Sequence, residues 1–491
     1  MALNFLDLLV ILAWLAAVTL FGLRFRSPER TLRAYFLADN AIPWWAIALS
    51  IVAAETSTLT VISIPGLAYA QDFRFLQLVF GYLIGRAIVA LLFLPAYFRG
   101  RMLTAYQLIL ARFGQRLHAL TAAIFLLTRA AAEGVRVFAV AIVVRIALGS
   151  LLTGFSNFAR DLAAIALVTV LTLLYTFEGG LAAVIWTDVV QLAVYLAGSL
   201  FACFTLLHHL PGGLHTVVAT AQPLGKFRLF DLSWNLTRSY TLWSGVIGGA
   251  LLTTASHGTD QLIVQRLLAA RSLRQSQLAL LASGVAILFQ FALFLFLGTA
   301  LFVFYRVFPV HALFHRSDAI YPTFIVSELP HGISGLLIAA ILAAAMANLS
   351  AALNSLASTT IFDFYVRLRP NSTESHRLRL ARRATLLWGV ALFLLALLAR
   401  GGGRVLEVGL SIASVAYGCL LGVFLLGLLT RSATESAAIL GMIAGLALNL
   451  YLWLATPVAF PWYVVFGSLA TFLVGYCSSR LIPIPDKAHT A

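Results

Sequence analysis

The chain has 491 residues, of which 61% are hydrophobic and only 10% are charged. Soluble globular domains are about half apolar and about a quarter charged, so this composition excludes a water-soluble fold. Each membrane-spanning helix needs about 20 apolar residues, and the hydrophobic residues therefore allow at most about fifteen crossings of a bilayer. We expect a single all-α polytopic membrane domain over residues 1–491, with the lipid bilayer as its surroundings.

The formal net charge of +15 arises from 33 Lys and Arg residues against 18 Asp and Glu residues. A nucleic-acid partner would require basic patches on soluble faces, whereas the arginines here stand between apolar segments. The three cysteines lie inside apolar segments, without a CxxC motif or a pairing pattern. We therefore predict no nucleic-acid partner, no disulfide framework and no obligate protein partner.

Apolar segments of spanning length recur about thirteen times along the chain. Lipid requires every backbone polar group to be bonded within its own segment, and the segments lack the alternation of a membrane barrel, so we predict helices. The predicted spans cover residues 5–23, 42–69, 75–98, 117–149, 159–177, 181–207, 241–266, 274–305, 333–364, 380–400, 405–429, 434–456 and 461–480.

Arginine accumulates in alternate loops between these spans, which is typical of loops that face the cytoplasm. The arginines of these loops are Arg24, Arg26, Arg30, Arg33, Arg99, Arg101, Arg112, Arg116, Arg271, Arg274, Arg367, Arg369, Arg377, Arg379, Arg382 and Arg383. With an odd number of spans, this pattern predicts a protein of the cell membrane with its N-terminus outside and its C-terminus in the cytoplasm.

Two spans turn polar at mid-depth, over residues 53–60 and 253–261. A broken helix frees backbone carbonyls, which the membrane tolerates only where they line a cavity or bind something. Paired interruptions in two halves of a chain indicate a transporter's central site. Close packing of helices through small hydroxyl residues is the alternative reading. The polar residues that would line such a site include Ser57, Thr60, Thr253, Ser256 and His257.

Ionisable residues deep in apolar spans are costly and are candidates for function. They are Glu55, Arg86, Arg129, Glu133, Arg136 and Asp188. Arg129, Glu133 and Arg136 share one helical face because they are spaced four and three residues apart. The three side chains either neutralise one another or, because positive charge exceeds negative charge there, bind a carboxylate.

His257 has two readings, as a hydrogen-bonded packing residue or as a proton relay. An enzyme is not expected, since the chain contains no HExxH or GxSxG motif and no nucleophile–base pattern.

Four stretches carry a family resemblance: Tyr35–Ala38, Gly179–Gln191, Thr259–Ala270 and Leu353–Asp363. Their order and sequence resemble the sodium:solute symporter family, from about residue 30 to 480. The resemblance implies a LeuT-type core of two inverted five-helix repeats at 42–207 and 241–429. An extra helix at 5–23 would precede the core and two helices at 434–480 would follow it.

The resemblance also implies sodium as the coupling ion, with no organic cofactor. Its implied ligands are the carbonyls of Ala53, Thr56 and Ala344 and the side chains at positions 347 and 348. Ala347 and Asn348 stand there in place of the family's hydroxyl pair, unless the register slips and Ser350 serves. A further ion-pathway residue by resemblance is Asp188, and Glu55 could attract the cation or carry a proton.

These features favour sodium-coupled import of a small organic solute by alternating access. The expected solute is a carboxylate-type anion, because Arg86, Arg129 and Arg136 outnumber Glu133. The residues expected to bind it are Arg129, Glu133 and Arg136. The alternative is a neutral sugar or polyol, with proton coupling as a further option. The hydrogen-bonding groups for a neutral solute would be Glu55, Ser57, Thr60, Gln77 and Thr253. Ser256 and His257 stand nearest to the position where the resemblance implies an aromatic gate. A channel or a transporter-like sensor is the alternative from a different class.

Overall fold

The computed structural model describes residues 3–24, 41–100, 102, 105–147, 154–175, 181–309, 314, 316–365, 368–401 and 405–481. These parts of the chain are helical, and the β-pairing found in them is an isolated bridge between Ile42 and Ala270. The elements are α1 (Phe5–Arg24), α3 (Trp44–Glu55), α4 (Thr58–Ala70), η2 (Phe73–Phe75), α5 (Leu76–Ile88), η3 (Val89–Phe93), α6 (Leu94–Arg99), α7 (Tyr106–Arg112), α8 (Gln115–Ala147), α9 (Asn157–Tyr175), α10 (Leu181–His209), α11 (Gly213–Ala221), η4 (Ser244–Gly248), α12 (Gly249–Gly258), α13 (Gln261–Leu268), α14 (Leu273–Val307), η5 (Ser317–Ala319), α15 (Ile320–Glu328), α16 (Ile333–Thr359), η6 (Thr360–Tyr365), α18 (Glu374–Leu398), η7 (Ala399–Gly401), α19 (Val405–Leu429), α20 (Glu435–Ala455) and α21 (Pro461–Leu481).

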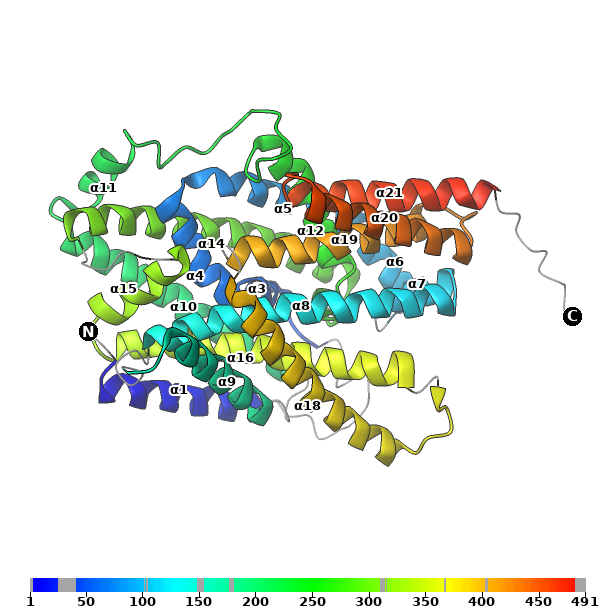
Figure 1. Cartoon of the computed structure of the whole chain (residues 1–491), viewed down its shortest axis with the longest axis horizontal. Helices are drawn as coiled ribbons and strands as arrows, with labels where there is room; N and C mark the ends of the chain where they lie inside the picture. The colour runs from blue at the N-terminus through cyan, green and yellow to red at the C-terminus, as the bar shows by residue number, and fades with distance from the viewer. Residues whose placement is uncertain are drawn as a thin grey trace, which may run out of the picture.

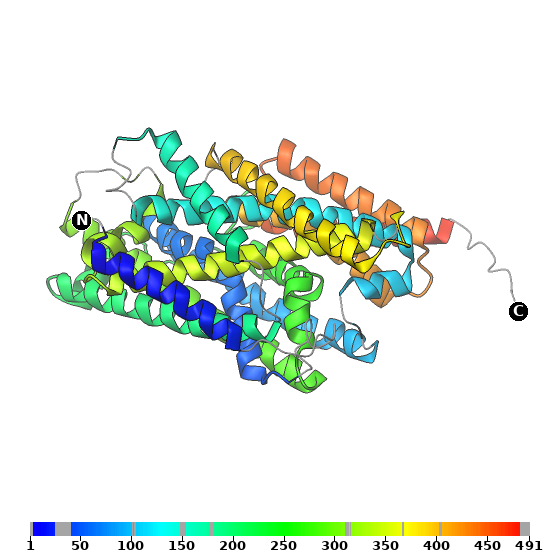
Figure 2. The same ribbon diagram turned by 90° about the horizontal axis from the view of Figure 1, so that it is seen from below.

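The long helices run roughly along one common direction, as Figures 1 and 2 show. The short helices α11 and α15 lie at one end of this bundle, and α7 lies toward the other end (Figure 1). In the described residues, seven helices are long and apolar enough to cross a membrane, or eight if the bent pair α3 and α4 forms one span. The predicted all-helical polytopic class is therefore confirmed.

The first predicted interruption is a sharp break between α3 and α4, whose axes differ by 64°. Helical hydrogen bonds end where the Thr56 amide donates to Val52 O (2.8 Å), and they resume where Val61 N donates to Ser57 O (3.2 Å). The carbonyls of Ala53 and Thr56 lie between these bonds and take no part in the ladder. This is the free backbone expected where a broken helix borders a site.

The second predicted interruption separates α12 from α13. Helix α12 ends at Gly258, and Asp260 caps the start of α13 by accepting a hydrogen bond from the Leu262 amide at 2.9 Å. An aspartate at this position satisfies an amide that the helix start leaves without a partner.

Glycines allow close approach of the helices around these breaks, as is common in membrane proteins. A Cβ atom on Gly81 of α5 would lie 2.2 Å from the carbonyl oxygen of Gly245 in η4. A Cβ atom on Gly298 of α14 would lie 2.1 Å from the carbonyl oxygen of Pro65 in α4. Both helix crossings therefore depend on the absence of a side chain.

Candidate functional site

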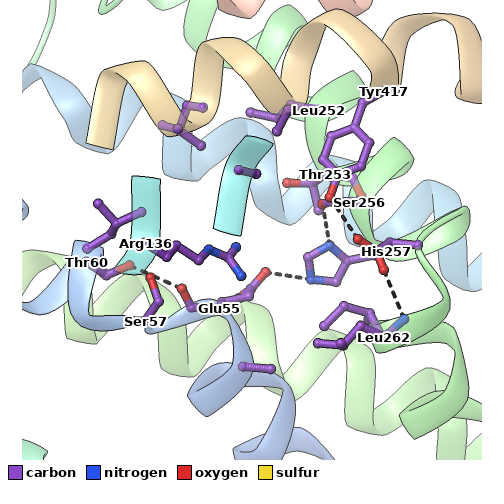
Figure 3. A pocket seen from close by; sticks show the side chains of 18 of the residues that line it. Glu55, Ser57, Thr60, Arg136, Leu252, Thr253, Ser256, His257, Leu262 and Tyr417 are labelled. Atoms are coloured by element: carbon purple, nitrogen blue, oxygen red, sulfur yellow. Dashed lines mark hydrogen bonds and ion pairs between the residues drawn. The ribbon is translucent and has the colours of Figure 1, made fainter. Parts of the chain in front are cut away.

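A cavity of about 190 Å³ lies beside both helix breaks. Figure 3 shows side chains from α3, α4, α8, α12, α13 and α19 around it. The polar residues that line it are Glu55, Ser57, Thr60, Tyr82, Thr128, Arg129, Arg136, Thr253, Ser256, His257, Asp260 and Tyr417. The remaining wall is mostly aliphatic and aromatic, which is typical of a pocket for a small organic molecule.

One group of polar contacts centres on Glu55, at the end of α3. The Glu55 carboxylate pairs with the guanidinium of Arg86 from α5, and its Oε1 lies 2.6 Å from Nε2 of His257 in α12. The other ring nitrogen of His257 lies 2.9 Å from Ser256 Oγ (Figure 3). Arg86 is fully buried, with Nε donating to Ser283 Oγ at 3.2 Å. Glu55 thus joins the first broken helix to the second.

A second group of polar contacts centres on Arg129 of α8. Its Nη2 lies 2.9 Å from Glu133 Oε1, and its Nη1 lies 3.6 Å from Asp260 Oδ2 of α13. Arg136 Nη1 donates to Glu133 Oε1 at 2.7 Å, while the Tyr417 hydroxyl donates to Asp260 Oδ2 at 2.9 Å. Arg129 is 8% exposed, and its buried Nε has no hydrogen-bond partner among the described residues.

These contacts change the charge count on which the anion prediction was based. Along α8 alone, two arginines face one glutamate, but Asp260 approaches Arg129 from α13. Arg86, the third arginine of the prediction, is paired with Glu55. The two groups together hold three arginines and three carboxylates, so the excess of positive charge expected from the sequence is absent from these described contacts.

Asp260 and Tyr417 were not among the sequence candidates. Asp260 sits one residue before α13, in the polar run 253–261, and its position after the break is the signal that could have indicated it. Tyr417 lies within an apolar helix, where nothing in the local sequence distinguishes its hydroxyl from that of any other buried tyrosine.

The hydroxyl residues predicted to line a site, Ser57, Thr60, Thr253 and Ser256, all border the cavity. Gln77 lies outside the cavity lining. Its amide nitrogen donates to the carbonyl of Tyr240 at 3.1 Å, and its oxygen accepts from the amide of Asp231 at 3.1 Å. These contacts attach α5 to the loop before η4.

Asp188 of α10 also lies outside the cavity lining, in a buried cluster with two other residues. Its Oδ2 accepts a hydrogen bond from Ser50 Oγ at 2.7 Å and pairs with Arg266 Nη2 at 3.0 Å. Arg266 Nε also donates to Ser50 Oγ at 2.9 Å. The cluster therefore ties α3, α10 and α13 together.

The other predicted ion ligands lie near the first break and on α16. The hydroxyl of Thr56 accepts from Gln290 Nε2 at 2.6 Å, and the hydroxyl of Thr58 donates to the carbonyl of Ile341 at 3.5 Å, which links α4 to α16. Ala344 and Asn348 are buried on α16, 9% and 8% exposed. The side chain of Ala347 lies outside the described part of the structure. Ser350, the substitute ligand, is 9% exposed on the same helix.

Comparisons with known proteins agree with this arrangement. Residues 35–445 match the family model described as "Sodium:solute symporter family". The chain belongs to the sodium:solute symporter family. It is a membrane transporter of small solutes and not an enzyme, as the sequence predicted. Of the stretches that carried the resemblance, residues 35–38 and 179–180 lie outside the described residues.

Several transporters are similar to this chain in sequence. The chain is 28% identical to "Sodium/sialic acid symporter NanT" of Aliivibrio fischeri, over 97% of this chain and 93% of that one. It is 28% identical to the human "Sodium/iodide cotransporter", over 87% and 66% of the two chains. It is 26% identical to "Sodium-coupled monocarboxylate transporter 1" of Mus musculus, over 86% and 68%.

Among solved structures, the fold is similar to one titled "Substrate-bound outward-open state of a Na+-coupled sialic acid symporter reveals a novel Na+-site". The TM-score is 0.84 at 27% identity, over 98% of both chains. A structure of Mhp1, a nucleobase-cation-symport-1 family transporter, is similar in fold, with a TM-score of 0.56 at 14% identity. The sodium-coupled symporter class predicted from the sequence is therefore confirmed.

Proposed function

We propose that this symporter imports a small organic carboxylate together with sodium. The observation that carries the proposal is Arg129, a buried guanidinium beside the cavity whose Nε lacks a hydrogen-bond partner in the described structure. Unpaired buried donors are costly, and a carboxylate is the ligand that best satisfies a guanidinium. Arg136, 30% exposed at the same cavity, offers further donors.

The relatives are consistent with this solute class, since they include proteins named as symporters of sialic acid and of monocarboxylates. The hydroxyls of Ser57, Thr60 and Thr253 would hydrogen-bond the rest of the molecule. The same hydroxyls would also hydrogen-bond a neutral sugar or polyol, which is therefore the competing solute class in the experiment.

For sodium we propose a site between the first break and α16. The carbonyls of Ala53 and Thr56 are free of helical hydrogen bonds, and Asn348 is buried on α16. Together with the Ala344 carbonyl these are hard oxygen donors of the kind that such cations prefer. The Asn348 oxygen would take the place of the family's hydroxyl pair, and Asp188 would support the ion pathway indirectly through α3 and α10.

The finer architecture belongs to the same proposal. Thirteen spans, with repeats at 42–207 and 241–429, would place the two broken helices at corresponding positions, as symporters with inverted repeats require. The N-terminus would lie outside and the C-terminus in the cytoplasm. Transport would then proceed by rocking of the repeats around the cavity, with sodium stabilising the state that is open to the outside.

Uptake into proteoliposomes with an inward sodium gradient tests the proposal, with a potassium gradient as the control. We expect sodium-dependent uptake of a radiolabelled carboxylate, loss of uptake in Arg129→Gln, and a higher half-saturating sodium concentration in Asn348→Ala. Uptake of neutral sugars alone would favour the competing solute class. Transport indifferent to sodium, or conductance far above the turnover of a carrier, would refute symport.

A further inference from the structure

We propose that the solute is a zwitterion, a carboxylate that also carries an ammonium group, with the ammonium bound at Glu55. This inference rests on the proposed carboxylate symport and specifies its solute class. It follows from the way the cavity separates its accessible charges, since an acid faces it from α3 and a guanidinium faces it from α8.

The cationic end of the cavity holds the guanidinium groups of Arg129 and Arg136, with the carboxylates of Glu133 and Asp260 beside them. Arg136 is 30% exposed and uses Nη1 for Glu133, so most of its five N–H donors remain for a ligand. Arg129 adds its unpartnered Nε beside the same cavity. Both residues lie on α8, whose helical spacing presents them on one face.

The acidic end of the cavity is Glu55. Its side chain is 18% exposed, whereas the Arg86 behind it is fully buried and absent from the cavity lining. A carboxylate has about four acceptor positions, and Arg86 and His257 engage one oxygen each. Acceptor capacity therefore remains on the side that faces the cavity.

Glu55 and Arg136 are not joined in an ion pair, because each is held by partners of its own. Glu55 is held by Arg86 and His257, and Arg136 by Glu133. Figure 3 shows both side chains in the same pocket, arriving from different helices. Because the described ion pairs do not join Glu55 to Arg136, a ligand with two opposite charges can contact both.

A solute with a single charge cannot satisfy both ends. A simple carboxylate would leave the remaining acceptor positions of Glu55 without a hydrogen bond, and it would add a second negative charge near it. An amine would leave the remaining donors of Arg129 and Arg136 without an acceptor. Buried donors and acceptors without a hydrogen bond are costly, so the cavity discriminates against both in favour of the zwitterion.

The test measures binding to the purified full-length protein, by thermal shift and calorimetry, in sodium and in potassium. The probes are matched pairs that differ only in the ammonium group: acetate with glycine, propionate with β-alanine, butyrate with 4-aminobutyrate and valerate with 5-aminovalerate, with n-butylamine as the single cation. A hydrogen bond to a charged group is worth about 1.5 to 3 kcal/mol, so we expect at least one amino acid to bind about tenfold more tightly than its matched acid.

In Glu55→Gln the ratio of the affinity for the amino acid to the affinity for its matched acid should fall to about one. The affinity for the matched acid itself should be retained or should increase. Because this variant leaves Arg86 buried without an acid, the double variant Glu55→Gln/Arg86→Gln provides a second measurement with no unpaired charge. Asp260→Asn removes an acid from the cationic end instead, and it should leave the amino-acid preference intact.

Equal affinity for acids and amino acids in the wild-type protein would overturn the zwitterion proposal and leave carboxylate symport standing. Tight binding of n-butylamine would overturn it too, as would a preference that persists in both Glu55 variants. If no probe of either series binds in a sodium-dependent manner, the proposed carboxylate symport fails together with it.

Discussion

The buried cluster of Ser50, Asp188 and Arg266 makes a quantitative prediction about stability. Asp188 and Arg266 are almost completely buried, and their contacts are 2.7 to 3.0 Å long. Asp188→Asn leaves the Arg266 guanidinium buried without an acid, bonded to Ser50 and the Leu262 carbonyl. Arg266→Gln leaves the Asp188 carboxylate buried without a cation, bonded to Ser50. Removing one partner of a buried pair costs about 3 to 5 kcal/mol, because the other charge remains without compensation.

A double-mutant cycle separates this pair energy from other effects of each substitution. In Asp188→Asn/Arg266→Gln no charge remains, and the two amides can bond to each other or to Ser50. We expect the double variant to lose less stability than the two single variants combined, with a coupling energy of about 2 to 3 kcal/mol. Reversible unfolding in mixed micelles, followed by tryptophan fluorescence, measures all four proteins.

Arg145→Gln is the matched control, since it makes the same kind of change in an ion pair near the surface. Arg145 is 32% exposed and lies 3.1 Å from Asp161, which keeps a second partner in Arg400 at 2.8 Å. Exposed pairs are worth at most about 1 kcal/mol. Additive losses in the cycle, or single losses as small as that of Arg145→Gln, would refute the reasoning.

Two further predictions concern the loop before η4 and the packing of α14. Hydrogen bonds from Ser233, with ion pairs from Arg74 and Arg238, lower the pKa of Asp231 from 3.8 to about 2. The Asp231 carboxylate therefore stabilises the loop fully above about pH 4, and this stabilisation is lost as the pH falls through 2. Hydrogen exchange of the loop amides should become faster over that range. In Asp231→Asn the exchange should already be faster at neutral pH. Gly298→Ala should lower the free energy of unfolding by about 1 to 3 kcal/mol, because the new Cβ would meet the Pro65 carbonyl. Gly409→Ala, whose Cβ would lie 3.5 Å from the nearest atom, should change it much less, and equal effects would contradict the packing argument.

The sequence predicted the helix breaks and the charged face of α8, because both depend on local chemistry. Both helix breaks coincide with polar runs inside apolar spans, because a membrane leaves unbonded backbone only beside a site. The face shared by Arg129, Glu133 and Arg136 follows from helical spacing, and the structure shows Glu133 in contact with both arginines.

The sequence could not predict which helices supply the partners of these residues. The pairing of Glu55 with Arg86 and the approach of Asp260 to Arg129 depend on how α3, α5, α8 and α13 pack. Gln77 illustrates the same limit. The sequence predicted this polar residue at the site, and in the structure it lies outside the cavity lining, where its amide hydrogen-bonds the backbone of a loop.

Two buried clusters of cross-helix contacts meet at α13. Arg266 of this short helix joins α3 and α10 through Ser50 and Asp188, while Asp260 at its start contacts Arg129 of α8 and Tyr417 of α19. A rigid movement of α13 would therefore stretch both buried clusters together. Since Asp260 compensates Arg129, such a movement would also change the charge that faces the cavity. If the solute is the proposed carboxylate, the position of α13 and the affinity of the cavity for it are linked through these two side chains.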